Sequence, residues 1–182
     1  MTGKPGSERL ERAARALVER LLEGGLTLSC AESCTGGMAA AAITGVPGAS
    51  EAFWGGVVAY SNDCKTRILG VSIATLSSHG AVSREAAREM AAGALAASGS
   101  DLAFSITGVA GPGGGSDGKP VGGVWLGWAS ASGLSSEAHE TFAGDRDEVR
   151  TAAAARALEG CLELAASLNA PSDVVPEDGP AS

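Results

Sequence analysis

Apolar residues recur at two different spacings along the chain. Over residues 8–23 they lie three or four positions apart, which predicts an amphipathic helix that ends at Gly24 and Gly25. Short apolar runs bounded by glycine or polar residues predict buried strands instead. By these criteria we expect strands at 26–30, 53–60, 101–107, 123–130 and 135–142. The further helices that we expect are at 35–44, 62–69, from about 83 and at 145–168.

The order of these elements predicts an α/β protein. Helices alternate with strands early in the chain and a pair of strands follows late, which is typical of a three-layer α/β/α sandwich with a mixed sheet. We expect one domain over residues 8–168, after a flexible N-terminus at 1–7. Residues 169–182 are rich in proline, acidic and without Lys or Arg, so we expect a disordered tail.

Charge and hydropathy exclude several classes of partner. The net charge is −8 and Lys and Arg form no run, which argues against a nucleic-acid-binding protein. Apolar runs stop well before the roughly 18 residues that a membrane helix needs, and the N-terminus has no signal-peptide core. We therefore expect a cytoplasmic protein without membrane contact. Faces of small residues and exposed apolar strands favour a homo-oligomer.

The four cysteines do not form a recognisable metal motif. Cys30 and Cys34 have a C-x3-C spacing without a matching pair of histidines, and Cys64 and Cys161 stand apart. We expect no metal, and we interpret the cysteines as reduced thiols packed as small hydrophobic residues.

The stretch AESCTGG at 31–37 joins a predicted strand to a predicted helix. The first N–H groups of such a helix favour negative charge, and Gly36 and Gly37 would allow a ligand to approach closely. Ser33 is therefore a candidate nucleophile, with neighbouring amides as an oxyanion hole. The simpler interpretation is that Ser33 or Thr35 only caps the helix.

A serine nucleophile needs a base. Neither His79 nor His139 lies in a sequence context that marks it as this base. Tyr60 ends a predicted strand, and Lys65 follows in the first turn of the next helix, so the three side chains could form a relay. In that relay Lys65 keeps Tyr60 basic and Tyr60 takes the proton of Ser33. Alternatively, Tyr60 is a half-buried strand end and Lys65 belongs to a solvated helix face.

Two later stretches are candidates for binding an anion. Residues 107–123 form a glycine-rich segment, although Pro120 stands where a P-loop needs Ser or Thr. Arg146 lies in the first turn of a helix that Asp145 and Glu148 are expected to cap, where a cation opposes the helix dipole. It could hold a phosphate at that helix end. A flexible surface loop and an ordinary ion-paired arginine are the alternatives.

Together these stretches resemble the CinA C-terminal domain family, the nicotinamide mononucleotide (NMN) deamidases. The resemblance spans residues 8–168 and rests on five ordered motifs: AESCTGG at 31–37, YSN at 60–62 followed by Lys65, HGAVS at 79–83, TGVAGPGGGSDGKPVG at 107–122 and GDRDEVR at 144–150. Cys64 and Gly123 depart slightly from the family pattern. Many members carry a further N-terminal domain, and we expect this chain to be a stand-alone deamidase domain.

The resemblance implies a three-layer α/β/α fold and hydrolysis of the NMN amide to nicotinic acid mononucleotide and ammonia, without a metal or cofactor. It implies Ser33 as the nucleophile, activated by Tyr60 and Lys65. Other residues would bind the substrate: the amides of Thr35, Gly36 and Gly37 would hold the oxyanion, and Thr107, Gly108 and Arg146 would hold the ribose phosphate.

Two other functions stay open. The chain could be a non-catalytic nucleotide-binding module with a role in competence or DNA damage, or an amidohydrolase for a different amide. The complete set of Ser33, Tyr60 and Lys65 favours an enzyme over a sensor, because a sensor would not need all three side chains.

Overall fold

A mixed five-stranded sheet organises the computed structural model, which describes residues 5–168. The strand order is β2-β1-β3-β4-β5; β1 pairs parallel with β2 and β3, whereas β3–β4 and β4–β5 are antiparallel. The predicted mixed sheet is therefore confirmed. The strands are β1 (Leu28–Glu32), β2 (Phe53–Val58), β3 (Leu102–Gly108), β4 (Gly123–Ser130) and β5 (Ser135–Thr141).

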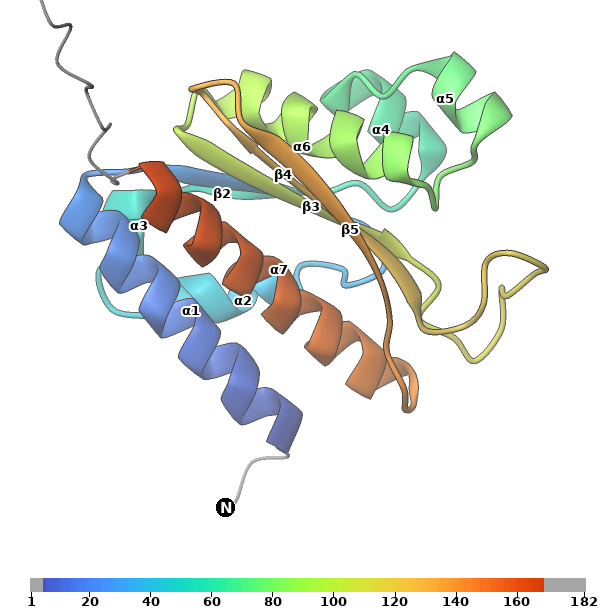
Figure 1. Cartoon of the computed structure of the whole chain (residues 1–182), viewed down its shortest axis with the longest axis horizontal. Helices are drawn as coiled ribbons and strands as arrows, with labels where there is room; N and C mark the ends of the chain where they lie inside the picture. The colour runs from blue at the N-terminus through green and yellow to red at the C-terminus, as the bar shows by residue number, and fades with distance from the viewer. Residues whose placement is uncertain (1–4, 169–182) are drawn as a thin grey trace, which may run out of the picture.

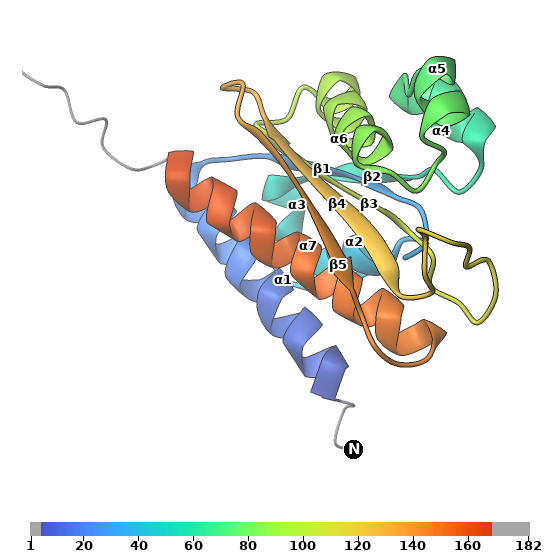
Figure 2. The same cartoon turned by 45° about the vertical axis from the view of Figure 1, so that its right-hand side comes forward.

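Helices cover both faces of this sheet, as Figures 1 and 2 show. One layer consists of α1 (Pro5–Gly24), α2 (Met38–Thr44), α3 (Ala49–Ala52) and α7 (Arg146–Leu168). The opposite layer consists of α4 (Asn62–Leu69), α5 (Ile73–Ser78) and α6 (Arg84–Ser98). In both views α1 and α7 run side by side. The arrangement is the predicted three-layer α/β/α sandwich. No helix within residues 5–168 is long and apolar enough to span a bilayer.

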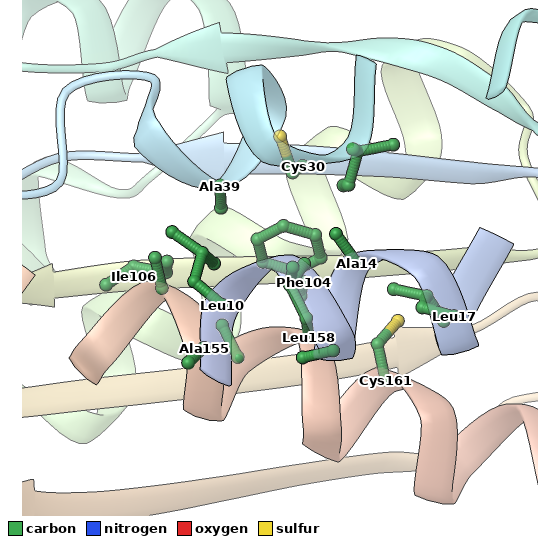
Figure 3. Packing of buried hydrophobic residues seen from close by; sticks show 14 of the residues in the cluster. Leu10, Ala14, Leu17, Cys30, Ala39, Phe104, Ile106, Ala155, Leu158 and Cys161 are labelled. Atoms are coloured by element: carbon green, nitrogen blue, oxygen red, sulfur yellow. The ribbon is translucent and has the colours of Figure 1, made fainter. Parts of the chain in front are cut away.

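Two apolar clusters hold the layers together. Phe104 of β3 lies at the centre of the first, among side chains of α1 and α7 such as Ala14 and Leu158 (Figure 3). The second cluster joins the sheet to α4 and α6. Small residues let the layers approach closely: a Cβ on Gly127 of β4 would lie 2.7 Å from the carbonyl oxygen of Ala87 in α6. Substituting this glycine would therefore push α6 away from the sheet.

Several predicted boundaries differ from those in the structure. Helix α1 begins at Pro5, so residues 5–7 are helical rather than loose; residues 1–4 and the predicted tail at 169–182 lie outside the described residues. Helix α2 begins at Met38 rather than at 35, because the backbone turns through left-handed conformations at Gly36 (φ 61°) and Gly37 (φ 93°). Helices α3 and α5 were not predicted. The limits predicted for α4 and β4 are confirmed.

Candidate active site

The carboxyl ends of the parallel strands β1, β2 and β3 meet at one edge of the sheet and open into a pocket of about 290 Å³. Ligands of open α/β sheets bind at this kind of edge. Ser33 directly follows β1, Tyr60 comes two residues after β2, and Thr107 and Gly108 end β3. All four line the pocket, together with Lys65 and Arg146.

Lys65 contacts Ser33 directly. Its Nζ donates to Ser33 Oγ at 3.0 Å and to the carbonyl oxygen of Ala59 at 2.6 Å. Ser61 caps α4 by accepting from the amide of Cys64, which places Lys65 one turn into the helix, beneath Ser33. Only 1% of Lys65 is exposed, and this burial lowers the pKa of its ammonium group below the ordinary value of 10.5. A neutral amine at this position could accept the proton of Ser33.

Tyr60 lies at the rim of the pocket and is 65% exposed. Its hydroxyl oxygen accepts from Arg146 Nη2 at 3.3 Å, while Arg146 Nη1 donates to the carbonyl oxygen of Gly111 at 2.7 Å. Within residues 5–168 no hydrogen bond joins Tyr60 to Ser33 or Lys65. The predicted order, with Tyr60 between Lys65 and Ser33, is therefore not the order of the hydrogen bonds. Tyr60 precedes the cap of α4, whereas Lys65 follows it and is buried.

Glu32 organises the turn that carries Ser33. Its buried carboxylate accepts from the amides of Gly37 (3.0 Å), Ala39 (3.2 Å) and Ala40 (2.8 Å). It thereby satisfies the first N–H groups of α2, a role that the sequence analysis did not assign. A carboxylate six residues before the first residue of the helix lies outside the usual capping pattern, which explains why the sequence did not reveal it.

The predicted oxyanion hole at Thr35, Gly36 and Gly37 is not found at the pocket. The amide of Gly37 is bound to Glu32, and the amide of Gly36 donates to the carbonyl oxygen of Ser33 at 3.1 Å. None of these three residues lines the pocket. The amides of Gly36 and Gly37 are therefore already engaged within the turn.

The glycine-rich segment forms one wall of the pocket. Thr107 Oγ1 donates to the carbonyl oxygen of Ala81 at 2.7 Å, which joins β3 to the 79–83 stretch. Thr107 and Gly108 thus lie where a substrate could reach them. The rest of the wall comes from the predicted motifs, but its individual residues were not predicted. These residues are Asn62, Ala81, Val82, Val109, Ala110, Gly111, Gly113 and Gly114.

Helix α7 begins with the predicted capping box. Asp145 Oδ1 accepts from the amides of Asp147 (2.9 Å) and Glu148 (3.0 Å), and Glu148 Oε2 accepts from the amide of Asp145 (2.8 Å). The predicted cap is therefore present, and its carboxylates occupy the amides at this helix end. Arg146 nevertheless lines the pocket, where its guanidinium is available to an anion.

Other nucleophiles and bases are less suited to catalysis here. Cys34 lines the pocket, but burial raises the pKa of its thiol to about 11, so the reactive thiolate is scarce at neutral pH. His139 lies against Trp125 with ring centroids 4.8 Å apart and ring planes tilted by 38°, and His79 Nδ1 lies 3.6 Å from a Glu85 carboxylate oxygen. Neither histidine lines this pocket. Within residues 5–168, no three His, Cys, Asp or Glu side chains cluster as metal ligands.

The chain is similar in sequence and structure to proteins of one known family. The model of the CinA C-terminal domain matches residues 10–165. Nicotinamide-nucleotide amidohydrolase PncC of Escherichia coli (strain K12) is 49% identical over 149 residues, which cover 82% of this chain and 88% of that protein. A crystal structure of the competence/damage inducible protein CihA from Agrobacterium tumefaciens superposes with a TM-score of 0.85 at 42% identity, and covers 90% of this chain and 99% of that one.

Longer relatives contain the same domain. A CinA-like protein of Geobacter sulfurreducens is 51% identical over 144 residues, which cover 79% of this chain but only 35% of that protein. The chain thus spans about a third of the CinA-like protein (35%) and most of the PncC enzyme (88%). With a family model matched over residues 10–165, the chain belongs to the CinA C-terminal domain family.

Proposed function

We propose that this chain is a nicotinamide-nucleotide amidohydrolase, which converts NMN to nicotinic acid mononucleotide and ammonia. The observation that carries the proposal is the 3.0 Å contact between Lys65 Nζ and Ser33 Oγ inside the pocket. A buried lysine beside a serine is a general base next to a nucleophile. The named activity of the PncC relative, at 49% identity, supports the choice of substrate.

In the first half of the reaction, neutral Lys65 takes the hydroxyl proton while Ser33 Oγ attacks the carboxamide carbon. The lone pair of the amine accepts this proton, and one of its N–H groups keeps the bond to the carbonyl oxygen of Ala59. The tetrahedral intermediate then collapses. The C–N bond breaks, Lys65 returns the proton to the leaving nitrogen, and ammonia departs from a serine ester.

In the second half, water attacks the ester carbon and Lys65 takes a proton from that water. The ester bond breaks, the proton returns to Ser33 Oγ, and the carboxylic acid product leaves. The balance is one water consumed and one ammonia released for each amide, so the reaction needs no redox partner. The amide groups that hold the oxyanion are not those of Gly36 and Gly37, because both are engaged within the protein.

Arg146 is the proposed ligand of the substrate phosphate. Two of its nitrogens bind Gly111 and Tyr60, and its remaining N–H groups lie beside the glycine-rich wall. Thr107 and Gly108 would contact the substrate from β3, and Tyr60 would contact it from the rim. In this proposal Tyr60 contacts the substrate and does not take part in the proton transfer, because Lys65 contacts Ser33 directly. The cytoplasmic location and the homo-oligomer belong to the proposal as well.

The test is ammonia release from NMN by the purified protein, measured with EDTA present and beside Ser33→Ala. Turnover by the native chain and none by a folded Ser33→Ala protein is the expected result. Equal turnover in both proteins would exclude Ser33 as the nucleophile. If NMN binds without turnover, the chain is a nucleotide-binding module; if NMN does not bind, the substrate is another amide.

A further inference from the structure

Arg150 reaches the turn of the nucleophile from α7. Its Nη2 donates to the carbonyl oxygen of Thr35 at 2.8 Å, a contact between residues 115 positions apart in the chain. Thr35 lies two residues after Ser33 and is fully buried. Arg150 is not among the residues that line the pocket, so it acts on the backbone of the turn rather than on a ligand.

Stability alone does not explain where Arg150 lies. Within residues 5–168, two buried side-chain polar atoms lack a hydrogen-bond partner. Both belong to the contact just described: Arg150 Nε and Thr35 Oγ1. The ion pair of Arg150 with Asp147 is 3.7 Å long and its carboxylate is largely exposed, so it contributes little. Unpaired buried donors lower stability, and natural proteins keep such features mainly at functional sites.

The turn that carries Ser33 needs a restraint from outside its own backbone. Gly36 and Gly37 have positive φ angles of 61° and 93°, and consecutive glycines leave a backbone flexible. Glu32 fixes the side of the turn that leads into α2. Arg150 fixes the other side, and its guanidinium packs over Gly36, where an added Cβ would lie 3.6 Å from Nη2.

The geometry points to Arg150 as a positioning residue, which holds the turn so that Ser33 Oγ stays within reach of Lys65. Arg146, four residues earlier on α7, contacts the glycine-rich wall and Tyr60 instead. The two arginines therefore divide the work: Arg146 belongs to the pocket, and Arg150 supports the nucleophile. The inference rests on the proposed function for its reaction, but the restraint applies to whichever amide Ser33 attacks.

The test compares Arg150→Met with Arg156→Met. Arg156 is a matched control because it lies on the same helix with similar exposure, 22% against 26% of the side chain, and pairs with Glu140 and Glu163. Three quantities are measured: the kcat and KM for NMN, the rate at which a fluorophosphonate probe labels Ser33, and the melting temperature. Ser33→Ala gives the background labelling.

For Arg150→Met we expect kcat and the labelling rate to fall by about 10- to 100-fold, with KM within about twofold, because a displaced nucleophile slows chemistry more than binding. We expect Arg150→Lys to recover part of the loss, because its ammonium group can still donate to the carbonyl oxygen of Thr35. Arg150→Gln is the second variant should the Met protein not fold.

Native kcat and labelling in the folded Arg150 variants would overturn the proposal, and so would an equal loss in Arg156→Met. A fall in melting temperature with native kcat would reduce Arg150 to a structural role and overturn the proposal too. A third outcome separates the two proposals. If the native protein does not hydrolyse NMN but the labelling of Ser33 still depends on Arg150, NMN is not the substrate and the positioning role of Arg150 stands.

Discussion

Lys65 Nζ lies 3.0 Å from Ser33 Oγ, with no residue between them. The contact joins the first turn of α4 to the residue that follows β1. Lys65 is buried without an ion-pair partner in residues 5–168, and this burial lowers the pKa of its ammonium group, which increases the neutral fraction. A base that is neutral near the working pH can accept the serine proton without help from a histidine or a metal.

The pH dependence of kcat/KM should report on Lys65. Because burial lowers the pKa of this ammonium group, we expect kcat/KM to rise with pH and to level off at an inflection below the ordinary lysine value of 10.5. The stability of the folded protein should also rise with pH. Between the lowered pKa and 10.5 the unfolded chain binds more protons than the folded protein, so this group makes the free energy of unfolding rise with pH.

The control for this profile is Lys65→Arg, which keeps a cation but cannot lose its proton. We expect its kcat to fall by about 10²- to 10⁴-fold, the usual contribution of general base catalysis, and its residual rate to lack the inflection. A flat profile of the native chemical step from about pH 6 to 9 would count against Lys65 as the base.

Tyr60→Phe distinguishes a direct base from a relay. Since Lys65 contacts Ser33 directly and the Tyr60 hydroxyl contacts Arg146, we expect this variant to keep kcat within about threefold of native. Loss of the hydroxyl should instead raise KM by about two- to tenfold, because Arg146 loses one of its partners. Steady-state kinetics with NMN separate the two effects, and a drop in kcat above about 100-fold would restore the relay through Tyr60.

Glu32→Gln should affect both stability and activity. The carboxylate accepts three backbone amides, whereas glutamine offers a single acceptor oxygen and directs an NH₂ group at the others. We expect a loss of about 2 kcal/mol, seen as a melting temperature lower by about 4–8 °C. The kcat should fall too, because the turn that carries Ser33 loses its anchor.

Glu51→Gln, an exposed change on α3, is the control for Glu32→Gln and should be neutral in both measurements. A native melting temperature in the Glu32 variant would mean that the amides of α2 find other acceptors, and that Glu32 is not the anchor of the turn.

Local pattern was enough to predict most of the layers. Local signals predicted the limits of α4 and the cap of α7, because they lie within a few residues of each helix end. The short helices α3 and α5 were missed because four to six residues are too few to show a period. The late start of α2 depends on left-handed glycines that the sequence does not distinguish from helical ones.

The residues of the site were easier to predict than their contacts. Ser33, Tyr60, Lys65, Thr107, Gly108 and Arg146 do share one pocket. The hydrogen bonds between these side chains were not predictable from the sequence. Lys65 contacts Ser33, and Tyr60 contacts Arg146, because the start of α4 buries Lys65 and leaves Tyr60 at the rim. Contacts between residues far apart in sequence, such as Arg150 with Thr35, leave no local pattern at all.

The exposed edge strand β2 predicts self-association. It ends the sheet next to β1, and it exposes Trp54 (60%) and Val58 (49%) along an unpaired edge. Exposed apolar edges invite pairing with another chain, so we expect a homo-oligomer built across β2. Light scattering should give a multiple of the 17.9 kDa chain mass, and Trp54→Lys should weaken association by about tenfold or more.

Leu134→Lys, at the exposed turn between β4 and β5, is the control, because it changes an apolar side chain of similar exposure (47%) away from this edge. A native protein that stays monomeric, or equal weakening by both variants, would rule out β2 as the interface.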